Sequence, residues 1–157
     1  MAKAKVAKPK KKVLNPEERA KRNLQRRHRR EIREVFSAVG FQCVESASDK
    51  EFTYDGVTSD FDDVFILENV VVFSEYTTSN DLSEHVKKKY LMYDRIRKDD
   101  AQFIGFARGT PLGIAGGLGS KYSDNQIRVI LLYCSLNTVQ ADLKAQIDHA
   151  LFMDYSI

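Results

Sequence analysis

The chain has 157 residues, of which 43% are hydrophobic and 30% are charged, and its formal net charge is +3. This length supports one hydrophobic core and excludes two independent domains of ordinary size. Two isolated cysteines exclude a disulfide scaffold and a cysteine-rich zinc site, and the sequence contains no apolar run of the roughly 20 residues that a membrane helix needs. We therefore expect an intracellular, cytoplasmic protein, for example in a bacterial cytoplasm or nucleoid, with no membrane partner.

Charge is unevenly distributed along the chain. Residues 1–34 carry 14 Lys/Arg and 4 Asp/Glu, whereas residues 35–157 carry 11 and 18. Residues 1–14 are rich in Lys and Ala and lack a hydrophobic period, which predicts a disordered basic tail that contacts polyanions; a solubilising tail or a cloning remnant is the alternative. Residues 15–157 are predicted to form a single α/β domain whose basic arm holds phosphates and whose acidic body holds a metal.

A long helix is predicted to begin at Asn15 and end at Gly40. Asn15 is a favourable cap, Pro16 suits the first helical position, and two acids follow in the first turn. The second half has a predicted core face at helical spacing: Ile32, Val35, Phe36 and Val39. The first half is dense in arginine and is predicted either to contact a phosphate backbone or to be a solvated extension; the candidate contacts are Arg22, Arg26, Arg29 and Arg30.

Strands are predicted to follow. Residues 41–45 begin a first strand, with 51–54 as a short continuation, and residues 58–79 contain two apolar runs separated by Glu68-Asn69. These two residues favour an antiparallel hairpin, in which the start of one strand lies beside the end of the other. Closure there would bring Asp60, Asp62 or Asp63 beside Glu75. Side-chain alternation selects Asp62 for the face that carries Glu75, whereas a one-residue bulge would select Asp63.

The second half of the chain predicts a mixed sheet covered by helices. An amphipathic helix is expected from about residue 81 to 98, carrying the run Lys87, Lys88 and Lys89, in which Lys89 lies on the stripe that faces the sheet. Residues 101–107 fit either a strand or a short buried helix, and 110–125 read as a flexible glycine-rich loop. A buried strand at 127–136, a helix at 139–149 and a strand at 151–155 complete an α/β pattern with parallel pairing.

The segment Asp62, apolar strand, Glu75-Tyr76-Thr77 resembles the motif of the PD-(D/E)xK, or restriction-endonuclease-like, nuclease superfamily, with Thr77 in place of the usual lysine. The resemblance covers roughly residues 17–155 and implies a core of helix, three strands, helix, strand, then helix and strand. It also implies a Mg²⁺ (or Mn²⁺) site held by Asp62, Glu75 and the Tyr76 carbonyl. Some relatives add a glutamate from the first helix, for which Glu31 is the candidate, although an ion pair with Arg27 is its ordinary alternative.

The resemblance implies a metal-dependent endonuclease, for which DNA is favoured over RNA as the substrate; an RNA-binding protein whose basic tail contributes most of the affinity is a further alternative. Thr77 cannot replace the motif lysine as a charged group, so we expect either that Lys89 reaches the site from the second helix or that the metal alone activates the water. Lys87 and Lys88 are expected over the DNA groove or on a solvated helix face. The alternative function is a catalytically inactive nucleic-acid-binding or assembly domain of the same fold. Other domains of a longer chain and a homodimer are further candidate partners.

Overall fold

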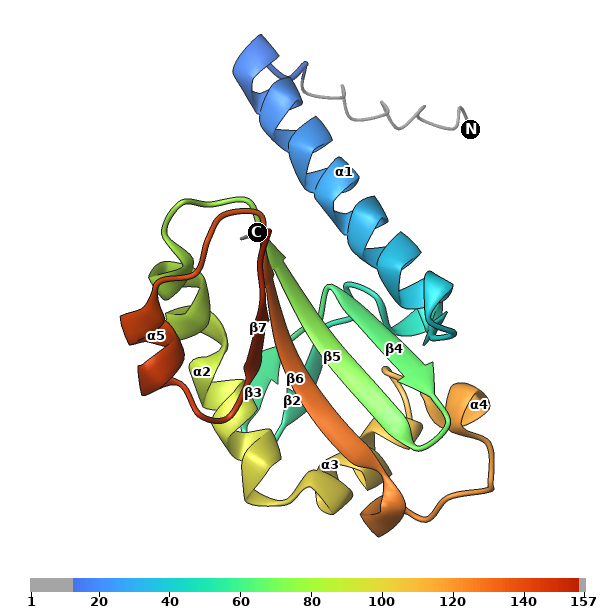
Figure 1. The fold of residues 1–157 in the computed structure, drawn as a ribbon. Coiled ribbons are helices and arrows are strands. Elements are labelled where there is room, and N and C mark those ends of the chain that lie inside the picture. The colour runs from blue at the N-terminus through green and yellow to red at the C-terminus, as the bar shows by residue number, and fades with distance from the viewer. Residues whose placement is uncertain (1–12, 156–157) are drawn as a thin grey trace, which may run out of the picture.

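A computed structural model describes residues 13–155 of the protein and confirms the α/β class, with a mixed sheet flanked by helices (Figure 1). Apart from Val13 and Leu14, the expected basic tail lies outside the described residues. Within residues 13–155, no helix combines the length and the apolar character needed to cross a membrane.

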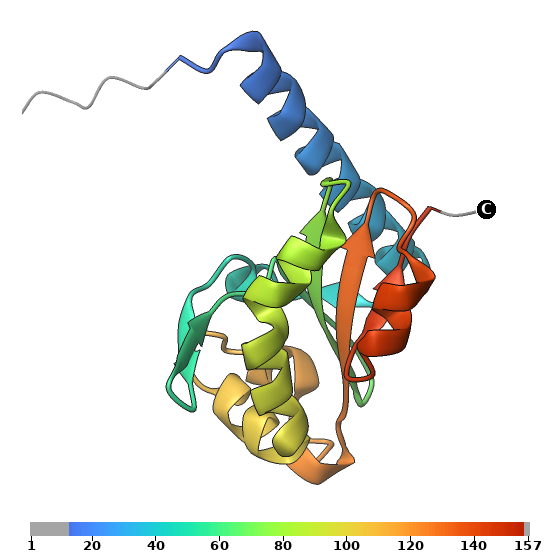
Figure 2. The same cartoon turned by 90° about the vertical axis from the view of Figure 1, so that its left-hand side faces the viewer.

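The first helix, α1, spans Pro16–Ala38 and begins with the predicted cap. The Asn15 side chain accepts a hydrogen bond from the Glu18 N–H at 2.8 Å, and the Glu18 carboxylate accepts one from the Asn15 N–H at 3.0 Å. The first half of α1 projects beyond the sheet, as Figures 1 and 2 show, and every residue from 15 to 27 is exposed. This half is therefore held mainly by its own backbone and cap.

Two of the four residues predicted to form the core face of α1 pack against the sheet, and two do not. Ile32 is buried against one face of the sheet, and Phe36 stacks on Phe65 with ring centroids 4.2 Å apart. Val35 and Val39 are instead 54% and 63% exposed. Only about one residue in four in this part of α1 faces the sheet. Side chains on either side of that narrow stripe therefore remain in solvent.

Five strands form the main sheet in the order β1-β4-β5-β6-β7. Their bounds are β1 Gln42–Cys43, β4 Asp63–Leu67, β5 Val70–Thr77, β6 Arg128–Ser135 and β7 Leu151–Met153. β1, β4 and β5 pair antiparallel, whereas β5, β6 and β7 pair parallel. The Glu68-Asn69 turn is confirmed, and its register joins Leu67 to Val70 and Asp63 to Ser74. The sheet is therefore mixed, as expected.

The segment between β1 and β4 differs from the expectation. A 3₁₀ turn, η1, covers Glu45–Ala47, and β2 Phe52–Tyr54 pairs with β3 Val57–Ser59 as a separate two-stranded hairpin. The predicted continuation at 51–54 thus leaves the main sheet, and residues 58–59 belong to β3 rather than to β4. The turn residues Asp55 and Gly56 both have positive φ, which lets so short a hairpin close.

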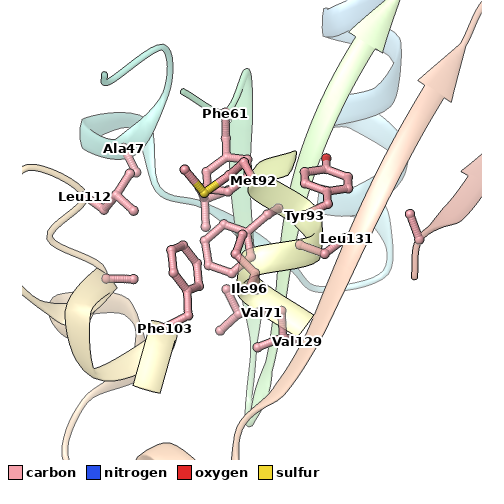
Figure 3. Packing of buried hydrophobic residues seen from close by; sticks show 14 of the residues in the cluster. Ala47, Phe61, Val71, Met92, Tyr93, Ile96, Phe103, Leu112, Val129 and Leu131 are labelled. Carbon is pink, nitrogen blue, oxygen red and sulfur yellow. The ribbon is translucent and has the colours of Figure 1, made fainter. Parts of the chain in front are cut away.

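The helices that follow cover the other face of the sheet. Their bounds are α2 Leu82–Lys98, α3 Asp100–Arg108, α4 Ala115–Leu118 and α5 Ala141–Gln146, with a 3₁₀ turn, η2, at Asp124–Gln126. The ambiguous run at 101–107 is helix, and the predicted last helix and strand are shorter than expected. Figure 3 shows Met92, Tyr93 and Ile96 of α2 in the core cluster with Phe103 of α3. Burial on both faces explains why residues 64–67 of β4 and 70–73 of β5 are all apolar.

Candidate active site

Asp62 and Glu75 lie side by side at one rim of the sheet, as the hairpin geometry predicts. Asp63, the first residue of β4, pairs with Ser74 of β5. Asp62 therefore lies opposite Glu75, and the Asp62 N–H donates to the Ser74 carbonyl at 3.1 Å. A third side chain, His85 of α2, joins them. One ligand atom from each of Asp62, Glu75 and His85 lies within 4.8 Å of the others, and this set is called the acidic cluster below.

Glu75 is the most enclosed member of the acidic cluster, with 1% of its surface exposed. Burial raises the pKa of Glu75 to about 7, although contact with His85 and the charge of Lys89 oppose the rise. Burial also raises the pKa of Asp62, against the stabilising hydrogen bond that its carboxylate accepts from the Tyr76 N–H at 2.7 Å. Glu75 is buried and Asp62 is half-buried, and two acids of raised pKa at one rim need a nearby cation to remain ionised at neutral pH.

Lys89 of α2 supplies positive charge to this rim. Its Nζ lies 3.0 Å from Glu75 Oε1, donates to Asp60 Oδ1 at 2.6 Å and donates to the Asp60 carbonyl at 2.7 Å. Burial would lower the pKa of Lys89, but the charge of Glu75 and the hydrogen bond to Asp60 raise it above the ordinary value. The lysine that the sequence predicts from the second helix therefore reaches the acids and stays charged.

Asp63 is not part of the acidic cluster, which corrects the alternative that a bulge would make it a metal ligand. The pairs from Asp63–Ser74 to Leu67–Val70 run without interruption, so Asp63 points to the opposite face, toward α1. Its buried carboxylate accepts hydrogen bonds from Arg29 at 2.9 Å, Arg33 at 2.5 Å, Ser48 at 2.6 Å and Tyr76 at 2.8 Å. Burial would raise the pKa of Asp63, but these donors hold it far below its usual range.

The remaining predicted ligands lie differently. Glu31 is ion-paired to Arg27 at 2.8 Å and accepts a hydrogen bond from Tyr155 at 3.1 Å, so the structure does not bring it to the acidic cluster. The Tyr76 side chain packs on the α1 face, while its backbone N–H holds Asp62. Thr77 is nearly buried, and its hydroxyl accepts from the Ser79 N–H at 3.1 Å.

A cavity of about 250 Å³, called the basic cavity below, opens beside Asp62. Its walls come from α1 and from the end of β5; the lining residues are Arg22, Gln25, Arg26, His28, Arg29, Asp62, Tyr76, Thr77 and Thr78. Three of the four arginines predicted to contact nucleic acid thus surround one acid of the cluster. Guanidinium groups suit phosphate oxygens because they donate two parallel hydrogen bonds.

The other predicted contacts lie outside this cavity. Arg30 is exposed and lies 3.8 Å from Glu34 one turn further along α1. On α2, Lys87 is exposed and pairs with Glu84 at 2.8 Å, and Lys88 is exposed beside it. The positive charge near the acidic cluster therefore comes from α1 and from Lys89 rather than from the first two lysines of the run.

His85 and Asp60 are site residues that sequence reasoning underrated. His85 Nε2 lies 3.5 Å from Glu75 Oε2, and Asp60 anchors Lys89. The signal for His85 was its position one helical turn before Lys89, which places both side chains on the same face of α2. The spacing alone does not reveal which face of α2 turns toward Glu75, so the sequence does not place His85 at the site.

Comparison of the chain with protein-family models, with curated proteins and with solved structures found no match.

Proposed function

We propose that the protein is a metal-dependent endonuclease domain that hydrolyses phosphodiester bonds of DNA. The observation that carries this proposal is the convergence of Asp62, Glu75 and Lys89, from three separate elements, at one rim of the sheet beside an arginine-lined cavity. Two carboxylates, a charged lysine and a phosphate-sized basic cavity are the parts that metal-assisted phosphodiester cleavage needs.

The arrangement of strands also supports the restriction-endonuclease-like core. One helix precedes three antiparallel sheet strands, a second helix follows β5, and the next sheet strand, β6, runs parallel to β5. This agrees with the order of helix, three strands, helix and strand that the resemblance of the Asp62 to Thr77 motif implies, except that α3 and α4 also lie between β5 and β6. The β2–β3 hairpin is an insertion between the first two sheet strands.

The acidic cluster suits a divalent cation. Asp62 and Glu75 offer the carboxylate oxygens that Mg²⁺ and Mn²⁺ accept, and the imidazole of His85 makes Mn²⁺ the better match of the two. A cation bound there would neutralise charge on the phosphate and lower the pKa of a water molecule. The ligands are already oriented, because the Tyr76 N–H holds Asp62 and the packing of β5 holds Glu75.

The protein side chains have separate roles in this proposal. Lys89 keeps its proton at neutral pH, so it stabilises negative charge on the phosphate or orients the attacking water instead of removing a proton. Arg22 and Arg26 receive the flanking phosphate in the basic cavity. Thr77 is the last residue of β5, and its hydroxyl carries no charge. In this proposal Lys89 therefore takes the place of the motif lysine.

Plasmid nicking in the presence of MgCl₂ or MnCl₂ tests the proposal. We expect the wild type to nick supercoiled DNA and the double variant Asp62→Ala/Glu75→Ala to be inactive. The matched control is Glu45→Gln/Glu51→Gln, which removes two exposed carboxylates outside the acidic cluster and should retain wild-type nicking. Wild-type nicking no faster than that of the Asp62/Glu75 variant would refute an active nuclease.

A second candidate function is a nucleic-acid-binding domain of the same fold without catalysis. The observation that favours it is the ion pair between Lys89 and Glu75, because the buried carboxylate already has a cationic partner without any metal. Retained DNA binding by a wild type that fails to nick would support this function.

A further inference from the structure

Five arginines of α1 form a continuous line along one side of the helix. Their spacing alternates between three and four residues, which places each above the last; they are Arg19, Arg22, Arg26, Arg29 and Arg33, called the arginine stripe below. The stripe begins on the projecting half of α1 and ends at the sheet (Figure 1).

The two ends of the arginine stripe differ in their partners. At the sheet, Arg29 and Arg33 are both bound to the buried carboxylate of Asp63. On the projecting half, Arg19, Arg22 and Arg26 are exposed, and no acidic side chain within residues 13–155 is paired with them. The sheet end is therefore a structural clamp, whereas the free end presents guanidinium groups to solvent.

Without an anionic partner, the arginines at the free end of the stripe repel one another and destabilise this half of α1. Like charges one turn apart destabilise a helix, and this half of α1 has no apolar face to compensate. An anionic partner with regularly spaced charges would reverse this repulsion. The basic cavity continues the line, because Arg22 and Arg26 line it together with Asp62.

We infer that one strand of a DNA duplex lies along the free end of the arginine stripe, with neighbouring phosphates of that strand held by Arg19, Arg22 and Arg26, and enters the basic cavity at Asp62. From the first to the last of these arginines the helix rises about 10 Å, at roughly 1.5 Å per residue. This length matches about three nucleotide steps of one DNA strand. The inference rests on the proposed function in that Asp62 marks the phosphate to be cleaved.

The positions of Asp62 and the arginines in the basic cavity determine on which side of the scissile phosphate the flanking phosphates are bound. An isolated carboxylate repels a phosphate, so the flanking phosphates are held on the arginine side, while a cation held by the acidic cluster would offset the repulsion between Asp62 and the scissile phosphate. Substrates with several phosphates on one side of the scissile bond should therefore bind much better than a single phosphodiester.

The test is DNA binding measured without cleavage. Fluorescence anisotropy of a labelled duplex of about 20 base pairs, in EDTA and between about 50 and 200 mM NaCl, gives the affinity and its salt dependence. The stripe variant is Arg22→Gln/Arg26→Gln. Its matched control, Arg27→Gln/Arg30→Gln, removes the same charge from the same helix at arginines that are paired with Glu31 and Glu34 and lie outside the basic cavity.

We expect the stripe variant to bind at least tenfold more weakly and to lose about two units of slope in the plot of log affinity against log salt, since each phosphate contact contributes about 0.9. The control variant should lose less than half as much slope. Equal losses in the two variants, unchanged binding in the stripe variant, or no binding by the wild type would overturn the inference. Equally tight, equally salt-dependent binding of poly-glutamate would also overturn it, because an acidic protein would then be the better partner.

The outcomes separate this inference from the proposed function. A wild type that binds through the stripe but does not nick DNA leaves the inference standing and supports the non-catalytic alternative. A wild type that nicks DNA while both arginine variants bind equally removes the inference and leaves the nuclease proposal intact.

Discussion

Lys89 Nζ lies 3.0 Å from Glu75 Oε1, although Glu75 belongs to the central strand β5 and Lys89 to the helix that covers it. The pair places a permanent positive charge at the rim where Asp62 and Glu75 converge. A metal that binds to the acidic cluster has to share Glu75 with this ammonium group.

Replacement of Lys89 by methionine should separate metal binding from catalysis. Without the ammonium group, the acidic cluster attracts a cation more strongly, and we expect Mn²⁺ to bind about tenfold more tightly. Nicking should nevertheless be slower by about 100-fold or more, because the charge that stabilises the phosphate is lost. Thermal-shift titration with MnCl₂ and a plasmid nicking assay measure the two effects. Lys88→Met, at the exposed neighbouring position, is the control, and weaker Mn²⁺ binding by Lys89→Met would contradict the prediction.

Metal binding should strengthen as the pH rises through neutrality. The pKa of Glu75 is raised to about 7 by burial, so below this pH a metal has to displace a proton from the carboxyl group, whereas above it the carboxylate is free to bind. We expect the apparent Mn²⁺ affinity to rise by about tenfold from about pH 6 to about pH 8 and the rise to be smaller in Glu75→Gln. Isothermal titration calorimetry at several pH values measures this dependence.

The same pKa shift makes a prediction for the metal-free protein. Because the folded state keeps the proton of Glu75 more tightly than the unfolded state does, the free energy of unfolding should fall as the pH rises from about 4.5 to about 7. Urea unfolding in EDTA should show this decrease in the wild type, and Glu75→Gln should show less of it. An identical pH profile in the two proteins would contradict the assignment of the raised pKa to Glu75.

Asp63→Ala should be strongly destabilising. The substitution leaves Arg29 and Arg33 without their shared buried carboxylate, and loss of one partner from a buried ion pair costs about 3 kcal/mol or more. Asp49→Asn is the control, because Asp49 pairs with the same Arg29 but is 57% exposed and should cost less than about 1 kcal/mol. Chemical unfolding at neutral pH measures both.

The depressed pKa of Asp63 adds a pH signature to this destabilisation. Its contribution is complete above about pH 5 and is lost progressively as the pH falls toward its lowered native value, since the carboxylate must then be protonated. The wild type should therefore lose stability steeply in acid, and the difference from Asp63→Ala should shrink there. If the difference in the free energy of unfolding between the two proteins were the same at all pH values, packing rather than charge would account for the contribution of Asp63.

Thr77→Lys should not increase DNA nicking, although it restores the motif residue. Thr77 lies on the same face as Glu75, so a second ammonium group would crowd a rim that Lys89 already neutralises. Nicking by Thr77→Lys should not exceed the wild-type rate, whereas Thr77→Lys/Lys89→Met should recover part of the activity lost in Lys89→Met. Thr77→Ser serves as the conservative control. A strong gain in Thr77→Lys alone would instead indicate a degenerate site.

Local sequence signals determined the features that depend on neighbouring residues. The Asn15 cap, the Glu68-Asn69 turn and the two-residue alternation in β4 and β5 were all predictable, and together they placed Asp62 beside Glu75. Closure of a hairpin fixes the register of its strands, and register fixes which side chains share a face. The helical stripe of α2 likewise pointed Lys89 toward the sheet.

Only the tertiary structure decided which charges meet across long stretches of chain. The clamp of Arg29 and Arg33 on Asp63 joins residues 34 and 30 positions apart, and the exposure of Val35 depends on the line along which α1 meets the sheet. The sequence by itself specified strands, turns and helix faces, because these follow from contacts a few residues apart. The division of the arginines between a structural clamp and a free surface depends on how separate elements pack, because long side chains find distant partners only after the sheet has formed.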